Sequence, residues 1–126
     1  MEEKTKIKSF TDLKAWQEAH KLVLLIYQIT KNFPRDEKFG LIDQIRRAAI
    51  SISSNIAEGF SKESRLDKKR FYYQSLGSLT ELQNQLLVAK DVDYLEKSRF
   101  NEIATQTISV SKLTNALIKY VRSENT

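Results

Sequence analysis

The feature that most limits how this chain can fold is its shortage of turn-forming residues. Only three Gly and one Pro occur in 126 residues. Strands of ordinary length need frequent hairpins, and few residues here favour such turns. A chain of this length can bury a usable core as one domain. We therefore expect long helices within a single domain over 1–126, with frayed ends at 1–9 and 123–126.

Composition also limits the environment and the partners of the chain. There is no Cys, which excludes disulfides and thiolate ligands. The N-terminal residues are polar and charged, with no visible signal peptide, and no apolar run is long enough for a membrane span. We expect a cytoplasmic protein with no membrane partner. Lys and Arg exceed Asp and Glu by 21 to 16, an excess that is compatible with a polyanionic partner without identifying one.

Apolar residues recur at spacings of three and four in four segments, over about 11–33, 36–58, 64–91 and 94–122. This period predicts helices. Thr11 or Asp12 is expected to cap the first helix, and Ser64 the third. Only a few residues separate each segment from the next, and short connections favour antiparallel packing of consecutive helices. The predicted fold class is all-α, an antiparallel up-down-up-down four-helix bundle.

The stretch "QIRRAAISISSNIAEGF" (44–60) alternates Ile with Ser as a strand would, but its wider pattern is helical. A single helical stripe explains the apolar residues of the whole segment, whereas "QIRRAA" has no strand alternation. Gly59 then lies where a left-handed C-terminal cap is expected. The stripe consists of Phe39, Ile42, Ile45, Ala49, Ile52 and Ile56.

Small and apolar residues also occur on the outward sides of these helices, where a monomer has no use for them. Leu25 projects away from the first stripe, Ile50 lies opposite the second, and Gly77 is a costly residue inside the third helix. Together they favour a homo-oligomer whose subunits meet through helices. The residues predicted at the interface are Leu25, Arg47, Ile50, Ser51, Ser54, Glu58, Gly77, Glu81 and Val88.

Catalytic motifs are not found in the sequence. His20 is the only histidine, and Glu18 precedes it by two residues, so the paired Glu-x-x-His motifs of metal-binding bundles are missing. No phosphate-binding loop or nucleophile elbow occurs. We expect no cofactor, no metal site and no enzymatic activity.

The segment "SKESRLDKKRFYY" (61–73) carries five cations and two acids between Lys62 and Arg70. Cations at a helix start oppose the macrodipole, so helix stability does not explain them. Phosphate contacts would explain them, and a tyrosine ring can stack on a base. The alternative is an ordinary solvated helix entry. The candidate nucleic-acid-binding residues are Arg46, Arg47, Lys62, Arg65, Lys68, Lys69, Arg70 and Tyr73.

Three phrases resemble a known family. They are "FTDLKAWQEAHKL" from Phe10, "FPRDEKFGLIDQIRRAAISISSNIAEGF" from Phe33 and "SLGSLTEL" from Ser75. They are similar to the four-helix bundle family of the bacterial 23S rRNA intervening-sequence proteins, which often has Pro at the position of Ser53. The resemblance implies a left-handed up-down bundle, a ring-like pentamer and no catalytic residues. It also implies kinship with the accessory proteins of diversity-generating retroelements, which bind nucleic acid and a reverse transcriptase.

Residues and resemblance together predict a non-enzymatic homo-oligomer, pentameric by resemblance, that binds RNA or DNA through a basic surface. The alternative is a protein-interaction scaffold that docks a partner enzyme, such as a polymerase or reverse transcriptase, without touching nucleic acid itself. The residues that match the family phrases are expected to serve packing and subunit contact more than ligand binding. They are Gln44, Arg46, Arg47, Asn55, Glu58, Gly59, Gly77, Ser78 and Glu81.

Overall fold

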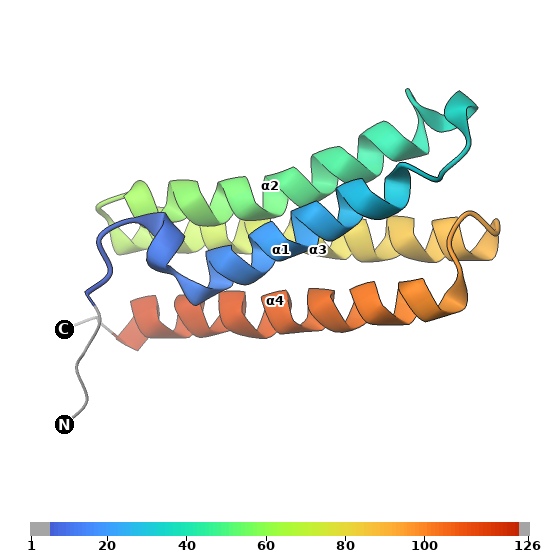
Figure 1. Ribbon diagram of the computed structural model, residues 1–126. Coiled ribbons are helices and arrows are strands. Elements are labelled where there is room, and N and C mark those ends of the chain that lie inside the picture. Colours follow the sequence, from blue (N-terminus) through green and yellow to red (C-terminus); the bar gives the residue numbers. More distant parts are fainter. Residues whose placement is uncertain (1–5, 124–126) are drawn as a thin grey trace.

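The computed structural model describes residues 6–123. Within that range the chain is all-α, a four-helix bundle without strands, which confirms the predicted fold class (Figure 1). Two short 3₁₀ turns, η1 and η2, precede α1 and α2. The elements are η1 (Phe10–Asp12), α1 (Lys14–Thr30), η2 (Arg35–Glu37), α2 (Leu41–Ser61), α3 (Arg65–Asp91) and α4 (Lys97–Ser123).

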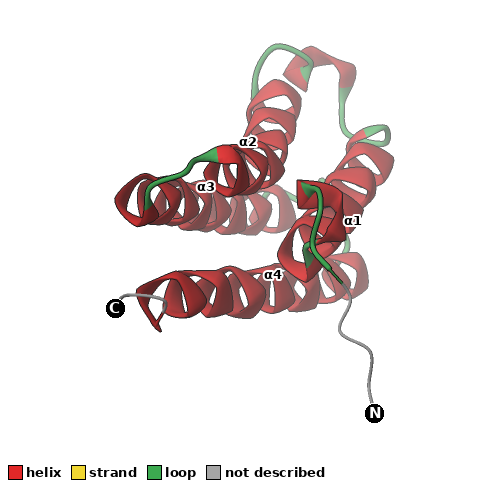
Figure 2. Ribbon diagram, turned by 90° about the vertical axis from the view of Figure 1, so that its left-hand side faces the viewer, coloured by secondary structure: helices red, strands yellow, loops and turns green. Residues whose placement is uncertain are grey.

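Neighbouring helices run antiparallel, so each end of the bundle collects particular segments (Figures 1 and 2). One end holds the start of α1, the connection between α2 and α3, and the last turn of α4; we call it the α2–α3 end. The opposite end holds η2 and the connection between α3 and α4. Each helix packs against two neighbours, and α2 and α3 share the most extensive contact.

The core consists of the apolar stripes facing one another. Two of its buried hydroxyls donate to backbone carbonyls: Thr30 Oγ1 donates to the Ile26 oxygen at 2.7 Å, and Ser75 Oγ on α3 donates to the Ile52 oxygen on α2 at 2.9 Å. Such bonds remove the penalty of burying a hydroxyl. The largest buried apolar side chains are Leu22, Ile26, Ile45, Ile52, Ile56, Leu82, Leu86, Ile103 and Val110.

The start of α2 differs from the prediction. The helix begins at Leu41 rather than Asp36, and Phe39, expected in the core, is 88% exposed. Glu37 fixes the corner that precedes the helix, because its Oε1 accepts the Leu41 N–H at 3.1 Å and its Oε2 accepts the Tyr94 hydroxyl at 2.9 Å. The stripe therefore starts at Ile42, and Phe39 falls outside the helical phase.

Gly59 does not end α2 as a left-handed cap. The helix continues to Ser61, and no described glycine has a positive φ. A Cβ at Gly59 would lie 2.6 Å from Cε1 of Tyr72 and 3.2 Å from Cβ of Phe71. The glycine is needed because α3 approaches α2 closely here.

The cap of the first helix was also wrongly predicted. Neither Thr11 nor Asp12 caps α1, whose N-cap residue Leu13 offers no side-chain bond. Instead Ser9 caps η1, and the Asp12 carboxylate accepts the N–H groups of Lys8 and Ser9, which lower its pKa. Of the ends that were expected to fray, 1–5 and 124–126 lie outside the described residues, whereas Ser9 caps η1 and Ser123 is the last residue of α4.

Candidate nucleic-acid interface

The predicted basic segment forms the entry to α3 at the α2–α3 end. Ser64 is the N-cap as predicted, and its Oγ accepts the Asp67 N–H at 3.0 Å. Lys68 turns back toward α2, where its Nζ donates to the Phe60 oxygen at 2.8 Å. Lys68 thus satisfies a carbonyl at the end of α2, and its ammonium faces the protein more than solvent.

The neighbouring cations lie over a single aromatic ring. Lys62 Nζ lies 5.1 Å from the Phe71 ring centroid, and the Arg70 guanidinium lies 5.4 Å from it. Arg70 also pairs with Asp67 at 3.3 Å, while Lys62 is the C-cap residue of α2. Contacts of this kind hold extended cationic side chains in place at little cost in solvation.

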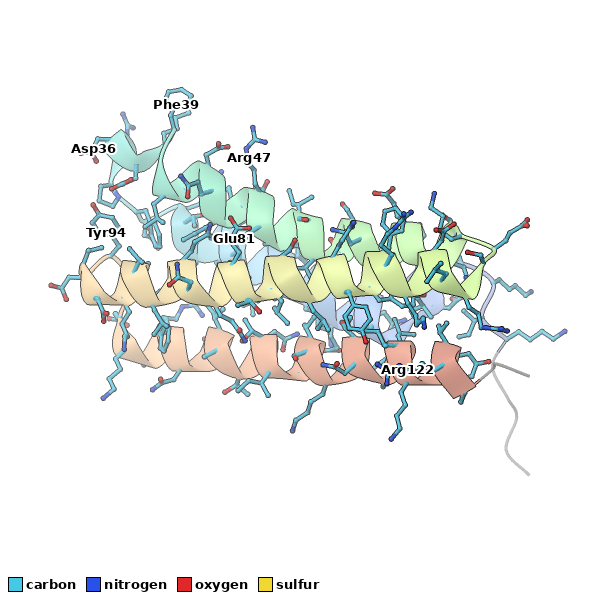
Figure 3. The ribbon with its side chains drawn as sticks, turned by 180° about the vertical axis from the view of Figure 1, so that it is seen from behind. Asp36, Phe39, Arg47, Glu81, Tyr94 and Arg122 are labelled. Carbon is cyan, nitrogen blue, oxygen red and sulfur yellow. The ribbon has the colours of Figure 1, made fainter. Side chains whose placement is uncertain are left out.

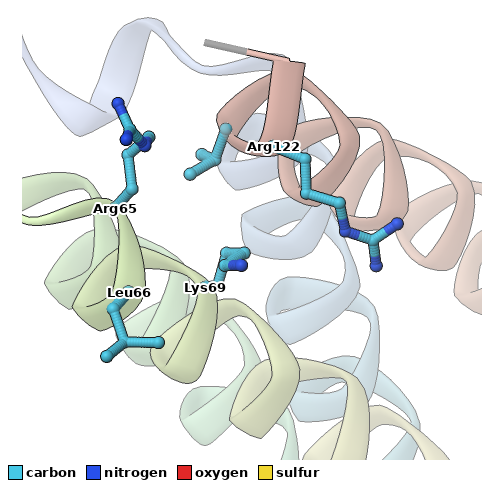
Figure 4. A pocket seen from close by; sticks show the side chains of 5 residues that line it. Arg65, Leu66, Lys69 and Arg122 are labelled. Carbon is cyan, nitrogen blue, oxygen red and sulfur yellow. The ribbon is translucent and has the colours of Figure 1, made fainter. Parts of the chain in front are cut away.

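Arg65 and Lys69 on α3 form a shallow pocket with Arg122 on α4 (Figure 4). Its volume is about 270 Å³, and Leu66 and Val121 complete the lining. Arg122 Nη2 donates to the Tyr73 hydroxyl at 2.6 Å, which positions its guanidinium. We refer to the five cations at this place as the cationic surface; they are Lys62, Arg65, Lys69, Arg70 and Arg122.

Arg122 was missed by the sequence-based prediction. The predicted topology could have identified it, because antiparallel packing of α3 and α4 places the last turn of α4 beside the first turns of α3. A cation one residue after the core position Val121 then lies next to Lys69. Pattern reading within a single helix cannot supply this neighbour.

Arg46 and Arg47 do not join the cationic surface. About four turns of α2, or about 23 Å, separate them from the end of the helix. Arg46 Nε donates to Thr30 Oγ1 at 2.9 Å, and the guanidinium lies 4.4 Å from the centroid of the Tyr27 ring on α1. Arg47 pairs with Asp43 at 3.0 Å and points outward, remote from Arg122 (Figure 3).

Most of the predicted interface residues are exposed on α2 and α3. Ser51 is the exception on α2, because its Oγ lies 2.7 Å from Ser78 Oγ and helps to join the two helices within the chain. Arg47, Ser54 and Glu58 recur at spacings of three and four with Ser51 and are exposed. Arg47 lies on α2 and Glu81 on the adjacent α3 (Figure 3). We call the exposed set the α2–α3 face; it comprises Arg47, Ile50, Ser54, Glu58, Gly77, Glu81 and Val88.

Leu25 and Gly77, two members of the predicted interface, have different surroundings. Leu25 was expected to be exposed in a monomer, but it is half-buried and packs against the core, whereas Leu24 is 56% exposed. The reason is that α1 packs against both α2 and α4, which covers both flanks of its apolar stripe. Gly77 faces outward, and a Cβ there would meet no atom within 4 Å.

The described histidine and carboxylates do not form a metal site. The exposed His20 ring stacks on the Trp16 ring with 4.7 Å between their centroids. Across residues 6–123, no three of His, Asp or Glu converge in a way that could hold a metal ion. In the same range, no helix combines the length and apolarity needed to cross a bilayer.

Comparison with known proteins gives a family and a fold. The model of the 23S rRNA-intervening sequence protein family matches residues 11–116. A crystal structure of a protein with unknown function from the S23 ribosomal protein family of Bacteroides thetaiotaomicron VPI-5482 superposes with a TM-score of 0.77. Its sequence is 23% identical, and the match covers 83% of this chain and 95% of that one. No curated protein matches the chain.

Proposed function

This chain belongs to the family of 23S rRNA-intervening sequence proteins, and from that premise we propose that it is a non-enzymatic, self-associating bundle that binds nucleic acid, RNA in particular. The observation that carries the proposal is the cationic surface, whose five cations lie at one end of the bundle: Arg65, Lys69 and Arg122 line one pocket, and Lys62 and Arg70 lie over the Phe71 ring. Phosphate contacts by Lys and Arg supply most of sequence-independent nucleic-acid affinity.

The electrostatics at the start of α3 support an anionic ligand. Arg65, Lys69 and Arg70 lie in the first two turns, where the helix macrodipole is positive, while Asp67 is the one acid in the first turn. Their placement raises the electrostatic energy of the unbound protein. A phosphate bound there relieves this repulsion and also interacts favourably with the helix N-terminus.

Tyr73 adds an aromatic group to the same surface. Its side chain is 48% exposed, and its hydroxyl is held by Arg122 at 2.6 Å. An anchored, exposed ring provides a stacking surface for an unpaired base, which is the usual partner of cationic grooves in single-strand binding.

Neutralising the cationic surface tests this proposal. The variant Arg65→Gln/Lys69→Gln removes two charges from it, and the control Lys31→Gln/Lys97→Gln removes two from the opposite end of the bundle. In mobility-shift titrations with single-stranded RNA at about 50 and 200 mM salt, we expect the first variant to bind more weakly. We also expect its salt dependence to be shallower by about 1.4 in log–log slope, that is, two phosphate contacts.

The control variant should bind as the wild type does, apart from a small effect of net charge. If both double variants bound RNA equally weakly, the cationic surface would contribute only through the net charge of the protein. Absence of binding by the wild type at the lower salt concentration would overturn the proposal.

Self-association is the second part of the proposal, and the α2–α3 face supports it. Ile50 and Val88 are 42% and 43% exposed, and Arg47, Glu58 and Glu81 add both signs of charge around them. A face with apolar, small and oppositely charged residues suits association between identical copies. Family resemblance suggests five subunits in a ring.

Light scattering tests this second part. A pentamer has five times the 14.6 kDa mass of the chain. Ile50→Asp should reduce the particle to a single chain, whereas Ile108→Asp, at a residue 52% exposed on α4, should leave its mass unchanged. A wild-type protein that is monomeric at micromolar concentration would refute self-association.

A specific observation favours a second candidate function, docking of a partner enzyme such as a polymerase or reverse transcriptase. An almost wholly apolar groove of about 160 Å³ lies between α3 and α4, where Leu87 and Ile108 are 45% and 52% exposed. Under this alternative, neutralising Arg65 and Lys69 leaves function intact. Retained self-association without any RNA binding would favour it.

A further inference from the structure

A second pocket adjoins the cationic surface at the α2–α3 end. Its volume is about 380 Å³, and its walls include Phe60 of α2, Tyr72 of α3, and Leu117, Tyr120 and Val121 of α4. Val121 also lines the pocket formed by Arg65, Lys69 and Arg122, so the two hollows share a wall. The volume lies within the range of small-molecule binding sites.

Tyr72 gives this pocket a polar group that no other described residue bonds. The side chain is only 2% exposed, and its hydroxyl has no hydrogen-bond partner among residues 6–123. The hydroxyl is not one of the fully enclosed polar atoms lacking a partner, so it retains access to the pocket. The hydroxyl is therefore available to donate to a group that enters the pocket.

The protonation state of Tyr72 makes it a donor. Burial raises the pKa of the phenol to about 12. At neutral pH the hydroxyl therefore keeps its proton and can donate to a carbonyl or a ring nitrogen. The ring itself is held against Gly59, where its Cε1 would lie 2.6 Å from an added Cβ, so the hydroxyl direction is fixed by close packing.

The remaining walls suit a flat, apolar-faced group. Phe60 and Tyr120 supply aromatic rings, and Leu117 and Val121 supply aliphatic contacts. Lys68 at the edge donates to the Phe60 carbonyl at 2.8 Å, which directs its ammonium toward the end of α2. Three further cations, Arg65, Lys69 and Arg122, lie across Val121 and can bind an anionic group there. A ligand that satisfies both hollows has a planar heteroaromatic part joined to an anionic part.

We propose that this apolar pocket receives one unstacked base of a single-stranded nucleic acid, with the Tyr72 hydroxyl donating to the base while adjoining phosphates lie on the cationic surface. The inference rests on the proposed nucleic-acid binding and narrows its ligand to unpaired strands. Single strands can present a base in this way because their bases leave the stack at low cost.

The test compares two labelled single strands of about 12 nucleotides, one intact and one with abasic sites at its central positions, by fluorescence anisotropy. We expect wild-type protein to bind the abasic strand roughly 10-fold more weakly, because stacking on the pocket walls is lost. Tyr72→Phe should weaken binding of the intact strand by about 3- to 10-fold, the value of one hydrogen bond, and leave the abasic strand unaffected.

Tyr72→Phe suits this purpose because it removes a hydroxyl that bonds nothing within the described chain and keeps the ring against Gly59. Urea denaturation should give wild-type or slightly higher stability, which separates a binding effect from misfolding. Tyr73→Ala is the matched control, because it removes an aromatic ring that lies outside the pocket. Tyr72→Phe should weaken binding of the intact strand by the same factor whether or not Tyr73 is present.

The outcomes separate this inference from the function it rests on. If both strands bind with equal affinity, or if Tyr72→Phe weakens neither or both, the base pocket is wrong while nucleic-acid binding stands. If Arg65→Gln/Lys69→Gln weakens both strands and Tyr72→Phe weakens the intact one alone, both proposals are supported. If neither strand binds at about 50 mM salt, both are overturned.

Discussion

Gly59 and Gly77 both lie inside helices, where glycine costs up to about 1 kcal/mol relative to alanine. Their surroundings are opposite. A Cβ at Gly59 would lie within 2.8 Å of two carbon atoms of the Tyr72 ring, whereas a Cβ at Gly77 meets nothing within 4 Å. The first glycine is thus required by packing inside the chain, and the second is not.

Alanine substitution at these two positions should therefore act in opposite directions. Gly59→Ala forces the Tyr72 ring to move and should lower the free energy of unfolding by about 1–3 kcal/mol. Gly77→Ala should raise it by up to about 1 kcal/mol. Urea unfolding on the Ile50→Asp background excludes effects of self-association. Wild-type stability for Gly59→Ala would contradict the close approach of α3.

Arg46 and Arg47 are adjacent in sequence, but their guanidinium groups have different surroundings. Arg46 bonds Thr30 at 2.9 Å and lies over the Tyr27 ring, whereas Arg47 forms an exposed pair with Asp43. Lysine keeps the charge and loses the planar fork. Arg46→Lys should cost about 1 kcal/mol of stability, and Arg47→Lys about zero. Thermal unfolding of the two variants measures the difference; equal effects would refute a structural role for Arg46.

At the scale of elements, Glu18 connects α1 to α4. Gln106 Nε2 donates to the Glu18 backbone oxygen at 2.9 Å and to its Oε1 at 3.0 Å, and Lys21 pairs with the carboxylate at 3.0 Å. The hydrogen bond from Gln106, followed by that from Lys21, lowers the pKa of Glu18 below its usual 4.5. The folded state therefore favours the ionised carboxylate.

This depressed pKa predicts a stability that depends on pH. The contribution of Glu18 is present above its unfolded pKa and is lost as the pH falls through the lower folded value. Glu18→Gln should be less stable than wild type at pH 7, and the difference should shrink as the pH falls below about 4.5. Urea midpoints between pH 7 and 3 measure it. Glu102→Gln, which removes an exposed carboxylate of α4, should leave the pH profile of the wild type nearly unchanged.

Most of each helix could be predicted from sequence, and the errors concentrate where one helix meets another. Periodicity identifies the stripes because burial repeats with the helix turn. It cannot show that Glu37 bonds Leu41 and Tyr94, the contact that starts α2 two residues after Phe39. It also cannot distinguish a capping glycine from one that admits a neighbouring ring, as at Gly59. Arg122 and Tyr72 likewise acquire their roles only from residues distant in the chain.

At the scale of the whole molecule, the α2–α3 face and the pocket formed by Arg65, Lys69 and Arg122 occupy different parts of the bundle. The face lies along the outer sides of α2 and α3, whereas the pocket lies at the α2–α3 end, between α3 and α4. Association through the face therefore does not require these three cations to be buried. Cyclic symmetry would place the cationic surfaces of all copies at the same level around the axis, where one long strand can contact several of them.

This arrangement predicts that self-association raises the affinity for long strands of nucleic acid but not for short ones. Ile50→Asp leaves every residue of the cationic surface unchanged, so its affinity for a strand that spans one subunit should equal that of the wild type. For a strand long enough to reach several subunits, its affinity should fall by roughly 100-fold, because avidity is lost. Anisotropy titrations with the two strand lengths, with Ile108→Asp as the control, measure this. A monomeric Ile50→Asp protein that bound the long strand as tightly as the wild type would show that each subunit binds alone.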